Sequence, residues 1–296
     1  MLYRSSWTRA YRGAAPSVAY LDGEWYVADT GNGRLVRVEA DNSEGTTVLS
    51  GLIEPRQLLA GGGVLWIAEA GASRVSRWTP GNATAEVVAA FVTEPVAMAS
   101  RDAILLVATA DQIVWVDTEI DTQSTLVDGL DGVGSLALVD EQVWFTELGT
   151  QSLTNAQLAR VGLSGGSVTT LVGQSVLQGA LRVPTVTWDE TSNQLAFPIV
   201  LDGWPYAGLI ARAAPTGGNL EVLSHGPPKM GPILATPDGL VLGSERTLLR
   251  ATADAAYTTL GPWTSASAVA TDGQGTIAWT DQHAGVLWVH GLNSGQ

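Results

Sequence analysis

The sequence GEWYVADTGNGRLVRV, residues 23–38, decides the fold. An apolar run with two aromatics ends at an acid, and a glycine-bearing turn leads into a second apolar run that opens with arginine. Short runs rich in Val, Leu, Trp and Tyr that end at turn residues are typical of β-strands. The stretch therefore predicts a β-hairpin.

The same pattern returns along the chain. Residues 63–78 read GVLWIAEAGASRVSRW, and residues 142–149 read QVWFTELG. Weaker copies of the apolar run occupy residues 103–109, 194–199, 239–245 and 276–281. A short apolar segment precedes each copy, and these segments begin near Ser17, Arg56, Val96, Ser135, Thr185, Gly231 and Ser267. Their spacing, roughly 36 to 50 residues, is the period of four strands per propeller blade.

We therefore predict an all-β chain: one seven-bladed β-propeller domain, residues 1–296, of four-stranded antiparallel blades. The blades are expected at about 14–50, 54–90, 94–129, 132–173, 182–224, 229–261 and 264–296. After the third strand of the last blade only the polar residues 291–296 remain. An outer strand at residues 2–11, which carries Trp7 and Tyr11, is expected to complete that blade and to remove an open sheet edge.

Composition limits the partners. The chain has 29 acids against 15 bases and a formal charge of −14, so it repels nucleic acid and anionic lipid. It has no cysteine, which excludes disulfides, thiolate metal ligands and a cysteine nucleophile. We expect a monomer that binds a protein or a small molecule, with no nucleic-acid or membrane partner. The start of the chain lacks the apolar stretch of a signal peptide, and the compartment is open, with an extracytoplasmic mature chain favoured.

The segments 25–38, 65–78 and 143–149 resemble blades of the NHL-repeat and virginiamycin B lyase-like propellers, which repeat an aromatic-aliphatic-Thr/Ala-acid-x-Gly-x-x-Arg pattern. The first two segments match well, and the third matches in its first half. The resemblance implies a propeller whose relatives include lyases, lactonases and pure binding scaffolds, so it says little about function. It leaves the cofactor open, with a divalent cation at the central channel as one alternative.

The ligands that such relatives use are not found at matching positions. The lyase is understood to use paired histidines with acids and a magnesium ion, and neither histidine aligns with this chain. The gluconolactonase group begins a blade with Glu-Gly-Pro, whose acid binds metal. Here the corresponding segments read Glu54-Pro-Arg and Glu94-Pro-Val, which does not support that ligand set.

An acid closes the second strand of most blades: Asp29, Glu69, Glu147, Glu245 and Asp281. These carboxylates form either a collar that binds a cation or a set of structural caps, each pairing with an arginine of its own hairpin. Asp29 with Arg34 and Glu69 with Arg74 share a five-residue offset, which favours the structural interpretation. An exposed pair of that kind is expected to contribute at most about 1 kcal/mol.

The connections between blades and the loops after second strands share one face of a propeller, and we place the site there. Blades four and five carry insertions at residues 149–156 and 200–207 on that face. The polar and aromatic residues of these segments are the candidate ligand-binding residues: Arg56, Glu94, Arg182, Trp204, Tyr206, His225, Lys229, Trp263 and His283.

Two function classes follow. A non-catalytic binding scaffold for a protein or small ligand is favoured, because no convergent acid–base set, nucleophile elbow or phosphate loop is present in the sequence. The alternative is a metal-assisted lyase or lactonase-type hydrolase with its site at the central channel. No catalytic residue is assigned. Four tryptophans that recur at equivalent strand positions are expected to pack the core: Trp25, Trp66, Trp144 and Trp279.

Overall fold

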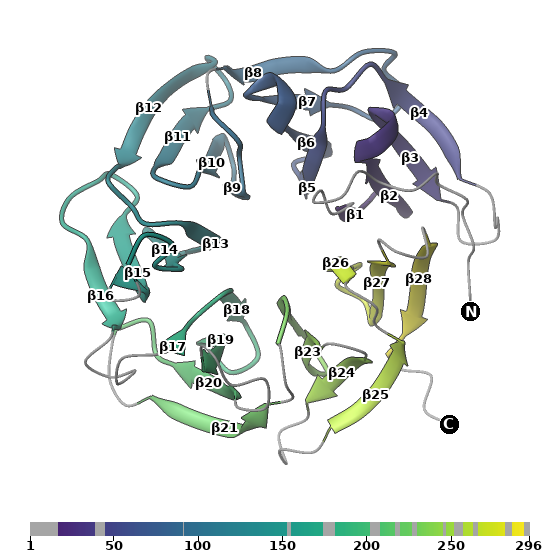
Figure 1. Ribbon diagram of the computed structural model, residues 1–296. Coiled ribbons are helices and arrows are strands. Elements are labelled where there is room, and N and C mark those ends of the chain that lie inside the picture. The colour runs from purple at the N-terminus through teal and green to yellow at the C-terminus, as the bar shows by residue number, and fades with distance from the viewer. Residues whose placement is uncertain are drawn as a thin grey trace.

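Seven antiparallel sheets stand side by side in a closed ring, so the chain is the predicted seven-bladed β-propeller (Figure 1). The computed structural model describes residues 17–38, 45–90, 92–152, 155–173, 181–201, 208–216, 220–226, 230–244, 247–251, 257–262, 266–281 and 286–292. No helix among these residues is long and apolar enough to span a bilayer.

The strands follow one another outward from the ring centre in each blade. Blades one to three consist of β1 (Val18–Leu21), β2 (Glu24–Asp29), β3 (Arg34–Val38), β4 (Thr46–Ser50), β5 (Pro55–Gly61), β6 (Val64–Glu69), β7 (Arg74–Trp78), β8 (Glu86–Ala90), β9 (Ala97–Arg101), β10 (Ile104–Ala108), β11 (Ile113–Asp117) and β12 (Thr122–Val127). Blades four and five consist of β13 (Val133–Val139), β14 (Gln142–Glu147), β15 (Gln157–Gly162), β16 (Thr169–Val172), β17 (Leu181–Arg182), β18 (Thr187–Asp189), β19 (Gln194–Leu201), β20 (Gly208–Ala213) and β21 (Glu221–Gly226). Blades six and seven consist of β22 (Ile233–Thr236), β23 (Gly239–Gly243), β24 (Thr247–Ala251), β25 (Tyr257–Pro262), β26 (Ala266–Thr271), β27 (Thr276–Asp281) and β28 (Val286–Gly291).

Two details depart from a uniform ring. The inner strand of blade five is split into β17 and β18, which both pair with β19. Blade seven contributes three strands, β26–β28, within the described residues, and the outer strand that we predict at residues 2–11 lies outside them. The innermost strands contact their neighbours around the ring, and β26 contacts β1, which closes it.

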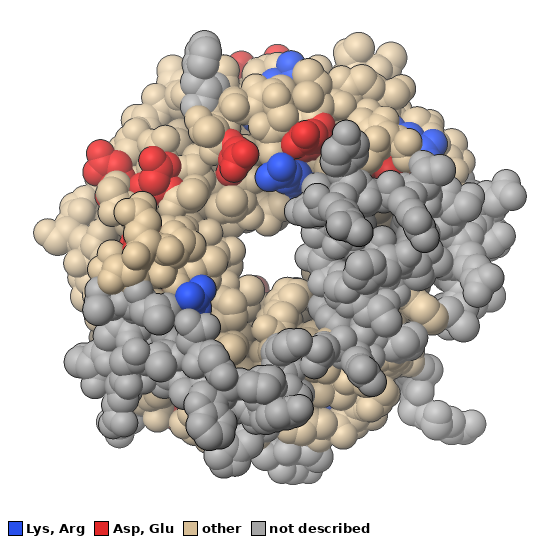
Figure 2. Space-filling view, viewed as in Figure 1, with Lys and Arg blue, Asp and Glu red and all other residues tan. Residues whose placement is uncertain are grey.

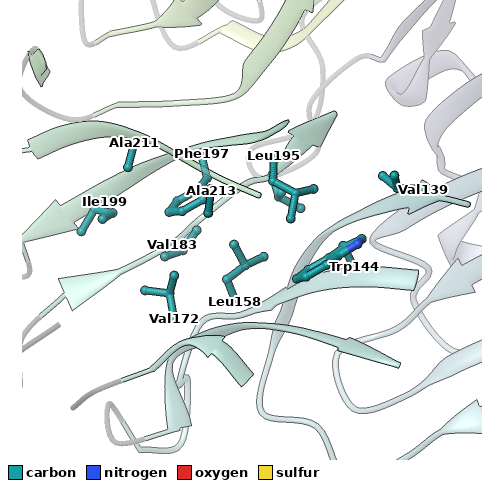
Figure 3. Packing of buried hydrophobic residues seen from close by; sticks show 11 residues of the cluster. Val139, Trp144, Leu158, Val172, Val183, Leu195, Phe197, Ile199, Ala211 and Ala213 are labelled. Atoms are coloured by element: carbon teal, nitrogen blue, oxygen red, sulfur yellow. The ribbon is translucent and has the colours of Figure 1, made fainter. Parts of the chain in front are cut away.

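The second strand of each blade is buried because neighbouring blades cover both of its faces. In β6, every residue after Val64 is buried, and β14 repeats that pattern after Gln142. Figure 3 shows the seam between blades four and five, where Trp144 and Leu158 face Val183, Leu195 and Phe197. The apolar interior therefore lies between the blades, which leaves the two faces of the ring to polar turns.

The four recurring tryptophans are buried, as predicted, but they do not hold four equivalent places. Trp66 and Trp144 are equivalent, since each lies opposite an arginine of the next strand, Arg77 or Arg160. Trp25 is one residue earlier in its strand, opposite Val38, and the residue opposite the corresponding arginine is Tyr26. Trp279 lies opposite Trp288 and stacks on it. All four rings have exposed fractions of 4% or less, which makes them core residues.

Candidate functional site

One face of the ring gathers the connections between blades and the turns after second strands, and we call it the loop face. Leu52, Val92 and Leu130, in three successive connections, each donate a backbone N–H to the preceding blade's turn, at Gly33, Ser73 and Asp111. The donor–acceptor distance is 2.9 Å in each case. This repeated bond fixes the connections against the turns, so residues from different blades lie together there.

Figure 2 shows the ring with an opening at its centre and acidic side chains over blades two and three. The short 3-10 turns η1 (Thr30–Asn32) and η2 (Ala70–Ala72), which follow β2 and β6, lie toward the viewer in Figure 1, so this view shows the loop face. The exposed acids of this face include Glu54, Glu94 and Asp111.

The structure describes the side chains of three of the nine candidate residues: Arg56, Glu94 and Arg182. The backbone of His225 lies in β21, but its side chain is outside the described part, as are Trp204, Tyr206, Lys229, Trp263 and His283. Arg56 is the second residue of β5, the inner strand of blade two, and pairs with Glu54 at 3.1 Å. Arg182 lies in β17 of blade five, where it is paired with Val200 of β19. It is therefore three blades away from Arg56. Whether the nine residues form one ligand surface stays a prediction.

Glu54 and Glu94 adopt a left-handed backbone conformation, with φ of 49° and 44°. This region disfavours residues that carry a Cβ, at a cost of roughly 1–2 kcal/mol. The repeated connection bond at Leu52, Val92 and Leu130 shows that the equivalent residue before blade four is Gly132, with φ of 76°. The first two connections therefore hold a glutamate in a conformation that glycine adopts without strain.

Glu69 is structural. Its side chain is fully buried, and its two oxygens accept hydrogen bonds from the Ile53 backbone, from Arg74 twice and from the Ser76 hydroxyl, at 2.6–2.9 Å. The predicted pairing with Arg74 is confirmed. The expectation of an exposed, weak pair is wrong, because only the arginine reaches solvent and the carboxylate also holds the incoming connection through Ile53.

Asp29 and Glu147 are held in related ways. Asp29 is buried and accepts hydrogen bonds from Arg34 at 2.7 Å and from Asn32. Glu147 is also buried, and it accepts the backbone N–H of Asp131 at 2.8 Å and a bond from the Gln157 amide. All three strand-end acids with described side chains therefore accept internal donors. Glu245 and Asp281 have no described side chain.

Asp131, in the connection that enters blade four, organises the insertion after β14. Its carboxylate accepts the Thr150 hydroxyl, the N–H groups of Gln151 and Ser152, and the Asn155 amide, all at 2.7–3.0 Å. The Gln151 N–H does most to lower the pKa of Asp131 to about 2, against the opposing effect of burial, and the other three donors add to it. A single carboxylate thus shapes the predicted irregular rim.

A cavity of about 570 Å³ opens beside this rim, between the connection from blade three and the outer part of blade four. Its polar and charged lining residues are Asp128, Glu147, Asn155, Gln157 and Thr170. Arg56, Glu94 and Arg182 do not line it. A second cavity, of about 490 Å³, opens on the opposite face and is lined by Trp66 and Arg77 among others.

Among the described residues, no group of three or more His, Cys, Asp or Glu side chains could hold a metal ion. His290, the one histidine with a described side chain, lies in β28 opposite Ile277. Burial lowers the pKa of His290, and the charge of Arg250 lowers it further.

Sequence reasoning identified Glu147 but missed Asp131 and Gln157. The local sequence Asp-Gly before blade four looks like an ordinary turn, and the donors to Asp131 lie 19 to 24 residues away, so no local pattern marks them. A signal for Gln157 exists: residues 157–160 read QLAR where blades one and two read RLVR and RVSR. Aligning the third strands would have found it.

Comparison with known proteins places the chain by fold. No family model matches the sequence, and no curated protein is similar to it at a significant level. The structure is similar to that of a streptogramin B lyase, with a TM-score of 0.75 and 13% identity over 99% of this chain and 97% of the other. It is also similar to hydrazine synthase of Kuenenia stuttgartiensis, with a TM-score of 0.77 and 10% identity over 98% and 100% of the two chains. The chain therefore shares its propeller fold with both of these proteins.

A third similar structure is PorZ of Porphyromonas gingivalis, a surface component of the type-IX secretion system, with a TM-score of 0.68 and 14% identity. That match covers 97% of this chain and 38% of the other. The predicted resemblance to virginiamycin B lyase-like propellers is thus confirmed for the fold. Identities of 10–14% carry the fold alone, because one propeller architecture serves catalytic and binding proteins alike.

Proposed function

We propose that the protein is a non-catalytic binding module that recognises a protein or small ligand with its loop face. The observation that carries the proposal is the contrast between two kinds of carboxylate on that face. The acids that close β2, β6 and β14 are buried and accept internal donors, as described for Asp29, Glu69 and Glu147. The exposed acids Glu94 and Asp128 lie in the connections around them.

The strained glutamates support the same conclusion. Backbone strain that the rest of a fold does not require is a feature of functional sites. Glycine serves at residue 132, so the connection itself does not need a side chain there. We infer that the side chains of Glu54 and Glu94 are used at the loop face, where they present negative charge to a partner.

The test is affinity capture with matched charge-reversal variants. One variant carries Glu54→Lys, Glu94→Lys and Asp111→Lys on the loop face. The control carries Asp102→Lys, Glu119→Lys and Asp121→Lys in exposed turns of the opposite face, so both have the same net charge. Loss of partners from the loop-face variant alone is the expected result. Equal capture by both variants would contradict the proposal.

A metal-assisted lyase or lactonase is the alternative, and metal content separates the two. The purified protein is analysed for bound divalent cations before any chelator is used. One tightly bound cation per chain, lost when His225 and His283 are replaced by alanine, would favour the enzyme. Retained partner binding after complete metal removal would favour the binding module.

A further inference from the structure

We propose that the cavity beside Glu147 is a binding site for a guanidinium group supplied by a ligand. The proposal rests on the loop face being the binding face, and it adds the chemistry of what is bound there. It comes from a comparison between blade four and blades one and two.

The three blades share one arrangement of paired strands. Asp29 lies directly opposite Arg34, Glu69 opposite Arg74, and Glu147 opposite Gln157. In blades one and two the residue opposite the acid supplies a guanidinium, at 2.7 Å from Asp29 and 2.8 Å from Glu69. In blade four the acid is kept and the guanidinium is absent, because a neutral glutamine occupies that register position.

The outer strand repeats the correspondence. Thr47 of β4 accepts a hydrogen bond from Arg34 at 3.0 Å. Its equivalent in β16, Thr170, instead donates to the Gln157 side chain at 2.5 Å. Both Gln157 and Thr170 line the 570 Å³ cavity. The space that opens in blade four is therefore bounded by the residues equivalent to those that surround a guanidinium in blade one.

The charge around the cavity suits a cation. Glu147 is 5% exposed, and no basic residue pairs with it within the described part of the chain. Asp128 adds a second, exposed carboxylate to the lining, and the described lining contains no lysine or arginine. The undescribed stretches nearest in sequence, 153–154 and 174–180, contain none either. A buried carboxylate without a counter-charge favours a cationic guest.

A guanidinium is preferred over an ammonium because the scaffold already binds one in a two-point geometry. Arg74 donates from Nε and from a terminal nitrogen to the two oxygens of Glu69, at 2.8 and 2.9 Å. A planar fork matches a carboxylate in this way, whereas an ammonium is a point charge. In blades one and two about a third of the arginine side chain is exposed, so such a group is reachable from solvent.

The experiment is a ligand-observed NMR titration of the full chain at low salt, with arginine methyl ester as the probe. Norleucine methyl ester is the matched control, since it keeps the α-ammonium and lacks the guanidinium. Lysine methyl ester tests the preference for a fork. We expect arginine methyl ester to bind with a Kd on the order of 1 mM, and the lysine ester to bind more weakly. The norleucine ester should not bind measurably.

Two variants locate the site. Gln157→Arg supplies the guanidinium from within the blade, as blades one and two do, and Glu147→Gln removes the charge. Each should weaken binding of the arginine ester by roughly tenfold or more. Ser164→Arg, at an exposed turn of the opposite face, adds the same charge and should leave binding unchanged. If either variant fails to fold, Asp128→Asn in the lining should weaken binding as well.

Equal binding of the arginine and norleucine esters, or unchanged binding to Gln157→Arg, would overturn the proposal. A capped Gly-Arg-Gly peptide separates the two sources of a guanidinium. Binding at least as tight as that of the ester identifies a partner's arginine, and exclusion of the peptide identifies a small molecule. The proposed function fails separately, because it is tested by partner capture with the loop-face charge variants, which leave Glu147 and Gln157 intact.

Discussion

Blades two and four start from the same hairpin and end with different properties. In blade two, Glu69 and Arg74 neutralise each other, and Ser76 completes the set of donors. In blade four, the donors to Glu147 among the described residues are neutral, and the loop after β14 folds around Asp131. A cavity lined by Glu147 opens beside this loop. A repeat protein can therefore form a site where one repeat keeps the acid of a structural ion pair and lacks the arginine.

The comparison also shows what the strand-end acids do in the fold. Glu69 and Glu147 each accept a backbone N–H from the incoming connection, at Ile53 and at Asp131. Each carboxylate therefore ties the end of its second strand to the preceding blade. Because a buried backbone N–H needs an acceptor, this role is independent of whether an arginine is present.

The largest effect on the free energy of unfolding is expected from disrupting the ion pair of Glu69 with Arg74 in blade two. Glu69→Gln removes the charge from a fully buried side chain that accepts four hydrogen bonds. We expect the free energy of unfolding to fall by about 2–3 kcal/mol. This is less than the loss expected from breaking a fully buried ion pair, because Arg74 is partly solvated. Urea unfolding followed by circular dichroism measures it.

The control for this measurement is Glu86→Gln. Glu86 pairs with Arg77 at 2.6 Å, but its side chain is 61% exposed, so the loss should stay below about 1 kcal/mol. A similar loss for the two variants would mean that burial of the strand-end acid does not matter, and the distinction between the blades would fail.

The next effect concerns the loop of blade four and depends on pH. The pKa of Asp131 is lowered from 3.8 to about 2, so the carboxylate stabilises the fold above pH 4 and loses that contribution as the pH falls toward 2. Asp131→Asn lacks this titration. We expect its melting temperature to lie below that of the wild type at neutral pH, and the gap to narrow between pH 4 and pH 2.

The variant keeps Glu147, which accepts the backbone N–H of residue 131, so this contact is common to both proteins. The difference between the two melting curves therefore isolates Asp131. A gap in melting temperature that stays constant down to pH 2 would show that hydrogen bonds to the Asp131 carboxylate do not stabilise residues 150–152 and 155.

The fold could be predicted from sequence because its signal is local and repeated. Strands of five or six residues, turn glycines and a period of roughly 40 residues lie within short windows, and the structure has the seven sheets that the repeats predict. The pairs of Asp29 with Arg34 and Glu69 with Arg74 were predictable for the same reason, since each spans five residues.

The candidate site was less predictable because its contacts are long-range. Thr150, Ser152 and Asn155 converge on Asp131 from 19 to 24 residues away, and whether Glu69 is buried depends on how blades pack. An insertion after β14 could be seen in the sequence, but not the carboxylate that shapes it. The missing arginine at residue 157 is a departure from a repeat, which becomes informative only once the register is known.

A smaller effect is expected from completing blade four. Gln157→Arg places a guanidinium opposite Glu147, as in blade two, and should stabilise the fold by about 1 kcal/mol. The gain should disappear in the background of Glu147→Gln, which a double-mutant cycle measures. An equal gain in both backgrounds would mean that the arginine acts elsewhere, and blade four would not be an incomplete copy of blade two.

The smallest effect tests the connections rather than the hairpins. Glu54→Gly gives blade two the residue that blade four has at position 132, where φ is also positive. Glycine relieves the strain of the left-handed conformation, which is worth roughly 1–2 kcal/mol. Two effects oppose this gain: the greater freedom of glycine in the unfolded chain, roughly 0.5–1 kcal/mol, and the loss of the exposed pair with Arg56. We expect a net change between no effect and about 1 kcal/mol of stabilisation.

Glu54→Ala is the control, because it removes the same carboxylate and keeps the Cβ. It should not stabilise the protein, and thermal unfolding of both variants beside the wild type makes the comparison. If alanine and glycine stabilise the protein equally, the wild-type glutamate destabilises it through repulsion between acids and not through backbone strain. If glycine alone stabilises the protein, the left-handed glutamate is a cost to folding, which is the expected outcome where the side chain serves the loop face.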